Sequence, residues 1–125
     1  MPRRFSIFLF CVLAACGCST QPALKTVTLP SGKIVRVISV MPIHFSSGET
    51  SLMLKYQTDL KVSDRDALRK EVDEIWSSFQ TDANNARVQS AIVSANEVPQ
   101  GAIIKSGQAF NFVYKKNADG TWQLQ

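Results

Sequence analysis

The chain has 125 residues, of which 45% are hydrophobic and 19% are charged, and its formal net charge is +4. That balance is ordinary for a globular protein, excludes an intrinsically disordered chain, and at this length indicates a single domain. The charge excess is too small to indicate nucleic-acid binding, and no basic stripe with interleaved aromatic residues occurs.

The first fifteen residues have the features of a secretory signal peptide. Arg3 and Arg4 form a positively charged start, and residues 5–15 are apolar apart from Ser6. An apolar run of eleven residues is too short to span a bilayer, which takes about 20, but it fits a signal-peptide core. We therefore predict that residues 1–15 are removed, which leaves 12 Lys and Arg against 10 Asp and Glu.

A specific motif follows this leader: Leu13, Ala14, Ala15 and Cys16 resemble the lipobox of bacterial lipoproteins, which consists of Leu, two small residues and Cys. The resemblance implies that the Cys16 thiol receives a diacylglyceryl group, that cleavage occurs just before Cys16, and that the new amine is acylated. Two or three acyl chains on one cysteine would anchor the protein lastingly, since one chain binds only weakly. Lipoproteins of the inner membrane often carry Asp at the next position. Gly17 therefore implies the outer membrane, or the outer face of the plasma membrane in a cell with one membrane.

The chain has three cysteines, Cys11, Cys16 and Cys18. Cys11 leaves with the signal peptide and Cys16 is lipidated, so no internal disulfide is expected in the folded domain. Cys18 is a second acylation site, an intermolecular bridge, or an ordinary residue of the tether. This tether, residues 16–25, is predicted to link the anchor flexibly to a domain at residues 26–125.

Three strands are predicted before a helix, at residues 26–29, 33–41 and 51–58. Residues 33–41 are apolar on both faces, so this strand is expected at the centre of a sheet or under a helix. Pro42 is expected to end or bend it. Alternation in the third strand places three residues on one face: Leu52, Leu54 and Tyr56.

An amphipathic helix is predicted at residues 64–84, with Ser63 as its N-cap and acidic residues in its first turn. Trp76 and Phe79 are interpreted as core residues that pack on the sheet, with a ligand platform as the functional alternative. The apolar stripe at helical spacing consists of Leu68, Val72, Ile75, Trp76, Phe79 and Ala83.

Three further strands are predicted after the helix, at residues 87–95, 108–116 and 121–124. The apolar pattern of residues 87–95 is less strict, which indicates a strand near an edge. The order β-β-β-α-β-β-β predicts an α+β fold, with one amphipathic helix on one face of an antiparallel sheet.

A candidate ligand or partner surface comes from two groups of apolar residues. Phe110, Phe112 and Tyr114 alternate along one predicted strand, with Trp122 expected beside them. If the helix covers this face they are core, and if it covers the opposite face they form an exposed strip that marks a binding surface. Ile103 and Ile104 belong to the same candidate surface because they lie in a predicted loop, residues 96–107.

No group of residues predicts catalysis, a metal site or a cofactor. His44 is the single histidine, and no second histidine or free Cys/His pair completes a metal site. Capping, dipole and solubility roles account for five acidic residues that could otherwise suggest paired carboxylates: Asp64, Asp66, Glu71, Asp73 and Glu74. No phosphate-binding loop or nucleophile elbow occurs.

The sequence therefore predicts a membrane-anchored bacterial lipoprotein that is not an enzyme and serves as an adaptor or accessory subunit for an envelope protein partner. The alternative is a small-ligand-binding lipoprotein with an apolar cavity lined by Trp76, Phe79 and Phe112. A third function, an enzyme acting on envelope polymers, needs convergent carboxylates or His44 in a cleft. The body of the chain resembles short bacterial lipoproteins only in kind, which assigns no residue a role.

Overall fold

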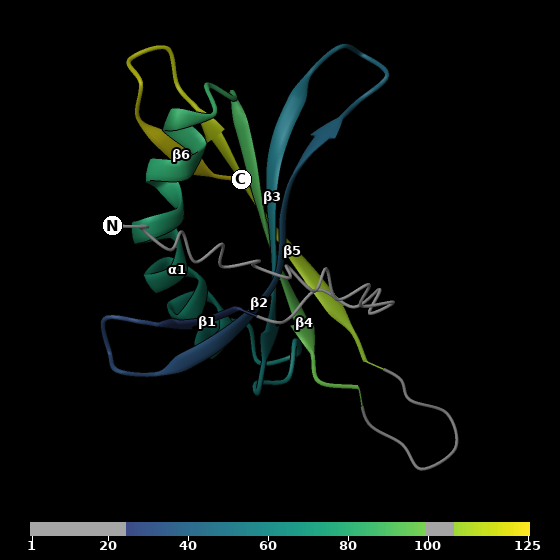
Figure 1. Cartoon of the computed structure of the whole chain (residues 1–125), viewed down its shortest axis with the longest axis vertical. Helices are drawn as coiled ribbons and strands as arrows, with labels where there is room; N and C mark the ends of the chain where they lie inside the picture. Colours follow the sequence, from purple (N-terminus) through teal and green to yellow (C-terminus); the bar gives the residue numbers. More distant parts are fainter. Residues whose placement is uncertain (1–24, 100–106) are drawn as a thin grey trace, which may run out of the picture.

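The computed structural model describes residues 25–99 and 107–125, and in them it shows one helix and a sheet of six strands (Figure 1). In chain order, the elements are β1 (Lys25–Thr28), β2 (Ile34–His44), β3 (Thr50–Thr58), α1 (Arg65–Asn85), β4 (Ser90–Glu97), β5 (Ala109–Lys116) and β6 (Trp122–Leu124). The strands lie side by side in this same order. The predicted α+β class, with one helix packed on a sheet, is confirmed. The predicted signal peptide and Cys16 lie outside the described residues.

The sheet is mixed, so the prediction of a fully antiparallel sheet is wrong. β3 and β4 run parallel, from Ser51 opposite Ser90 to Thr58 opposite Glu97. The four other neighbouring pairs are antiparallel. The reason is the position of α1, which carries the chain back from the end of β3 to the end at which β3 began. A strand that follows such a crossover runs in the same direction as the strand before it.

β4 lies between β3 and β5, so the prediction that it lies near an edge is wrong. Its first six residues are buried. Small side chains explain the weak apolar pattern. Ala91 and Ala95 belong to the core under the helix, while Ser90 and Ser94 are buried on the other face. A strand with small residues on both faces shows little hydrophobic alternation even where it is fully covered.

β2 is neither central nor covered along its whole length, contrary to the prediction. β1 pairs with it only from Ile34 to Val37, after which the pairing with β3 shifts register before Ser39. Among the described residues, no strand pairs with the outer edge of residues 39–44. Pro42 does not end the strand, because a missing N–H is tolerated at an edge without a neighbour.

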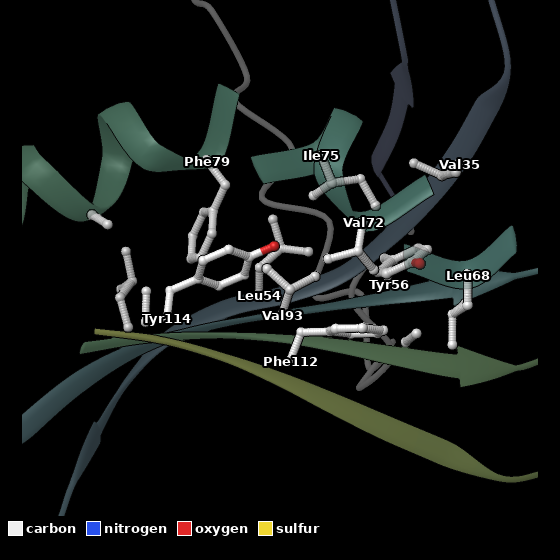
Figure 2. Close-up of a cluster of buried hydrophobic side chains, with 14 of the residues drawn as sticks. Val35, Leu54, Tyr56, Leu68, Val72, Ile75, Phe79, Val93, Phe112 and Tyr114 are labelled. Atoms are coloured by element: carbon white, nitrogen blue, oxygen red, sulfur yellow. The ribbon is translucent and has the colours of Figure 1, made fainter. Parts of the chain in front are cut away.

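The helix α1 buries its apolar stripe against one face of the sheet. The helix begins after Asp64, not after the predicted N-cap Ser63, and Asp64 Oδ1 accepts a hydrogen bond from the Ala67 N–H at 3.4 Å. Figure 2 shows Leu68, Val72 and Ile75 pointing from the helix toward side chains of the sheet. The predicted stripe residues that are buried are Leu68, Val72, Ile75, Phe79 and Ala83.

The turn between β1 and β2 is joined to the outer side of this core by two polar contacts. Lys33 forms an ion pair with Glu71, which is only 5% exposed. Ser31 Oγ donates to Glu74 Oε2 at 2.8 Å. A buried carboxylate needs such a partner because desolvation disfavours its charged form. These two contacts therefore hold the β1–β2 turn against the first half of α1.

Candidate functional site

The predicted aromatic surface lies largely under the helix. Phe112 and Tyr114 are 7% and 4% exposed, because α1 covers their face of the sheet (Figure 2). The ring of Tyr114 stacks on Trp76, with centroids 3.8 Å apart and planes 2° from parallel. Of the two arrangements considered for this strand, the structure has the one in which these aromatic residues are core. The prediction of a binding surface is therefore wrong for Phe112 and Tyr114.

Phe110 and Trp122 are half-buried and are already engaged by groups from α1. The Arg65 guanidinium carbon lies 3.5 Å from the ring centroid of Phe110, a cation–π contact. The indole N–H of Trp122 donates to Asn84 Oδ1 at 2.9 Å. These contacts join the two ends of α1 to β5 and β6, so each of these aromatic side chains is already in contact with a group of α1. Ile103 and Ile104 lie outside the described residues.

Tyr114 carries a buried hydroxyl for which residues 25–99 and 107–125 offer no hydrogen-bond partner, which leads to a testable prediction. Tyr114→Phe should leave the free energy of unfolding at pH 7 unchanged or raise it by up to about 1 kcal/mol, because no hydrogen bond is lost. Burial raises the pKa of Tyr114 to about 12 from 10.0. The unfolded chain therefore loses this proton first, and stability that is present below pH 10 is lost as the pH rises toward 12.

Urea unfolding of wild type and Tyr114→Phe from pH 7 to pH 12 checks this prediction, and the variant should lose less stability above pH 10. Some alkaline loss should remain, because burial also raises the pKa of Tyr56. A loss of more than about 1 kcal/mol at pH 7 would show that the hydroxyl has a partner after all.

The space between the helix and the sheet bears on the ligand-binding alternative. Phe79 and Trp122 lie edge-on to Trp76, at centroid distances of 5.9 and 5.3 Å, so protein groups surround its ring. An apolar groove of about 120 Å³ does reach Phe79, but β1 and β2 form its other wall, and Trp76 and Phe112 do not line it. Ligand pockets typically enclose roughly 300–1,000 Å³. This groove is therefore small for an organic ligand.

The described side chains that could act as acids or bases lie far apart along the fold, and His44 and Glu97 are already hydrogen-bonded to other protein groups. His44 is exposed, and its Nδ1 lies 3.1 Å from Thr50 Oγ1. The Glu97 carboxylate accepts hydrogen bonds from the N–H groups of Val62 and Gln108, at 2.8 and 3.3 Å, and these lower its pKa, with Val62 contributing most. Within residues 25–99 and 107–125, no three or more His, Cys, Asp or Glu side chains gather where a metal ion could bind.

The face of the sheet opposite α1, here called the open face, carries an apolar row across four strands. Cross-strand register places Met41 opposite Met53, Met53 opposite Ile92, and Ile92 opposite Val113. Met41 is 41% exposed, while Ile92 at the centre is 9% exposed. The described elements place no helix over this row (Figure 1). Contacts with other molecules are therefore to be sought on the open face.

One end of the open face has a hollow of about 390 Å³, here called the Ile34–Val98 hollow. Ile34 is 61% exposed, more than any other large hydrophobic residue described, and Val98 is 38% exposed. The rest of the lining consists of the buried Val35 and four polar residues: Lys33, Arg36, Gln57 and Asp59. Sequence reasoning did not single out these residues. The one feature of the sequence that could have indicated this surface is the strand that contains Ile34, because that strand is apolar on both faces.

The other end of the open face has a hollow of about 430 Å³ beside the β2–β3 turn. Phe45, which is 44% exposed, forms one wall. The hydroxyls of Ser51 and Ser90 are hydrogen-bonded to each other in its floor, and Ser90 Oγ also donates to Glu49 Oε1 at 3.3 Å. Both hydroxyls already have hydrogen-bond partners, and the bond between them links β3 to β4. They are therefore not positioned as nucleophiles.

Comparisons with known proteins add no assignment. No family model matches the chain, and neither a curated protein nor a solved structure shows significant similarity to it. In the part of the chain that the structure describes, no helix has both the length and the apolar character needed to cross a bilayer.

Proposed function

We propose that this chain is a lipid-anchored, non-enzymatic envelope protein: an adaptor or accessory subunit that presents its open face to an envelope protein partner. The anchor is Cys16, on the periplasmic face of the outer membrane, or on the outer face of the plasma membrane where a cell has one membrane. The resemblance to a lipobox after a short basic and apolar leader supports the anchor.

The observation that carries the adaptor role is the Ile34–Val98 hollow. Ile34 and Val98 place exposed apolar surface at one end of the open face, where it would otherwise remain in contact with water. Arg36, Gln57 and Asp59 surround them with polar groups of both signs. An apolar centre with a polar rim is the common composition of a protein–protein interface. The hollow therefore fits a protruding side chain of a partner better than it fits a reacting substrate.

Site-specific photocrosslinking in intact cells tests the adaptor role. A photoreactive residue at Ile34 should join the protein to one envelope partner, and the same residue at Ser77, an exposed position on α1, should not. Arg36→Glu should reduce the yield at Ile34, because it reverses a charge in the hollow. Equal yields from both positions, or recovery of the protein alone across growth conditions, would contradict the proposal.

A further inference from the structure

We propose that the end of the β2–β3 hairpin, residues 39–53 and here called the hairpin end, docks on the lipid bilayer as a second membrane contact beside the anchor. This inference rests on the proposed anchor at Cys16 and adds an orientation to it. The contact would place Phe45 and Met41 at the boundary between headgroups and acyl chains, and the Ile34–Val98 hollow away from the bilayer.

The first argument is the exposed apolar surface of the hairpin end. Val40, Met41 and Phe45 are 48%, 41% and 44% exposed, and they lie where β1 no longer covers β2. Glu49 is the only residue with a formal charge among residues 38–54. Apolar side chains with few charges between them are what allows a protein surface to enter the interfacial layer of a bilayer.

The second argument is the direction in which the tether leaves the domain. β1 is antiparallel to β2, with Lys25 opposite Val37 and Thr28 opposite Ile34. The N-terminal end of β1 therefore faces the hairpin end and not the Ile34–Val98 hollow. The tether would therefore join the domain at the end of the sheet where Val40, Met41 and Phe45 are exposed.

The third argument is reach. The chain from Cys16 to Lys25 covers nine Cα–Cα steps, and a fully extended chain of that length spans roughly 30–32 Å. The strand from Val37 to Phe45 covers eight steps, or roughly 26 Å. An anchor held at Cys16 can therefore lie level with the tip of the hairpin, but it cannot lie far beyond it. A bilayer is thus always within reach of the hairpin end, whereas a protein partner must diffuse to it.

Lipid-borne quenching of a fluorescent label tests this inference. The lipidated chain carrying Cys18→Ser is reconstituted in vesicles of phosphatidylethanolamine and phosphatidylglycerol that contain a doxyl-labelled lipid. An environment-sensitive fluorophore is attached at Ser46→Cys in the hairpin end, or at Ser77→Cys on α1 as the matched exposed control. Quenching should be several-fold stronger at position 46 than at position 77.

A pair of variants ties the docking to the apolar side chains. Met41→Ser with Phe45→Ser should lower the docked-to-undocked ratio of the label at position 46 by roughly tenfold, the equivalent of about two buried methylenes. Thr81→Ser, which removes an exposed methyl group on α1 outside both surfaces, should leave that ratio unchanged. The substituted side chains are exposed, so circular dichroism should show all variants folded.

Three results would overturn the inference, and they are distinguishable. Protein that floats with the vesicles but shows equal quenching at both positions refutes the docking and leaves the anchor standing. Protein that does not float at all refutes the anchor and the docking together. Quenching or burial at position 46 that appears only after envelope extract is added assigns the hairpin end to a protein partner instead.

Discussion

Replacing Cys16 with alanine is expected to abolish labelling of the protein by a fatty-acid probe and to release it from the membrane fraction. In the proposed anchor the Cys16 thiol would be the nucleophile that takes the lipid, and alanine offers none. Each acyl methylene contributes about 0.8 kcal/mol to membrane binding, so the loss of all chains removes nearly the whole anchoring free energy. The weak contact proposed for the hairpin end cannot replace it. Metabolic labelling and flotation of membranes from cells measure both quantities.

Cys18→Ala is the matched control, because Cys18 lies two residues from the proposed anchor and would be the one free thiol after the proposed cleavage and lipidation. This variant should be labelled and should float like the wild type if Cys18 is an ordinary tether residue. Partial loss of label would instead show a second acylation site. Labelling that persists in Cys16→Ala and disappears in Cys18→Ala would move the anchor to Cys18.

Phe79→Ala is expected to lower the free energy of unfolding by about 3–5 kcal/mol. Phe79 is 1% exposed, and its ring fills the space between α1 and the sheet, so truncation leaves a cavity as well as losing buried surface (Figure 2). Domains of this size typically unfold at a total cost of about 5–15 kcal/mol, so this loss is a large fraction of the whole stability. Urea unfolding followed by far-ultraviolet circular dichroism, on the mature chain with Cys16→Ala, measures the loss.

Ile34→Ala serves as the control, because this apolar side chain is mostly exposed and its truncation should change stability by no more than about 0.5 kcal/mol. The comparison separates the two interpretations of Phe79. A core residue gives the large loss. A ring that served as a ligand platform would cost less than about 1 kcal/mol on truncation, and that outcome would restore the ligand-binding alternative.

The helix and one face of β3 were readable from the sequence because local patterns determine them. The apolar stripe of α1 recurs at the helical period from Leu68 to Ala83, and these residues are buried whatever the helix packs against. Alternation from Leu52 to Tyr56 similarly assigns one face of β3. Glycine also marked the turn after β1, where Gly32 has a φ of +89°.

Strand direction and neighbour order were not readable in the same way. Whether β4 runs parallel or antiparallel to β3 depends on the end of the sheet at which the chain arrives after α1. The residues of β4 give no indication of that end. Its central position was hidden because Ser90, Ala91, Ser94 and Ala95 are small and give a weak pattern. Small size is what lets a strand be covered on both faces, but in sequence it resembles partial exposure.

The candidate surface is wrong at Phe112 and Tyr114 because exposure depends on how the elements are assembled. Phe112 and Tyr114 alternate along β5 in the same way whether their face is exposed or covered. They are core because α1 packs on that face of the sheet. Ile34 and Met41 occur in a strand rich in Val and Ile, which predicts burial. Both are exposed because α1 does not reach the open face, and Met41 also lies beyond the four residues of β1. Such facts are properties of the assembled sheet.

The parallel seam between β3 and β4 has a consequence for how the protein folds. The strands β1 to β3 and β4 to β6 form two meanders of antiparallel strands, each closed by nearby residues. The core under α1 includes residues of both meanders, such as Leu54 of β3 and Val93 of β4, so either meander alone would leave part of this apolar face in water. Ser51 and Ser90 meet only after the chain has passed through the whole of α1, so this closure carries the largest loop entropy in the sheet. We therefore expect the two meanders to fold cooperatively, at a rate set by that single long-range closure.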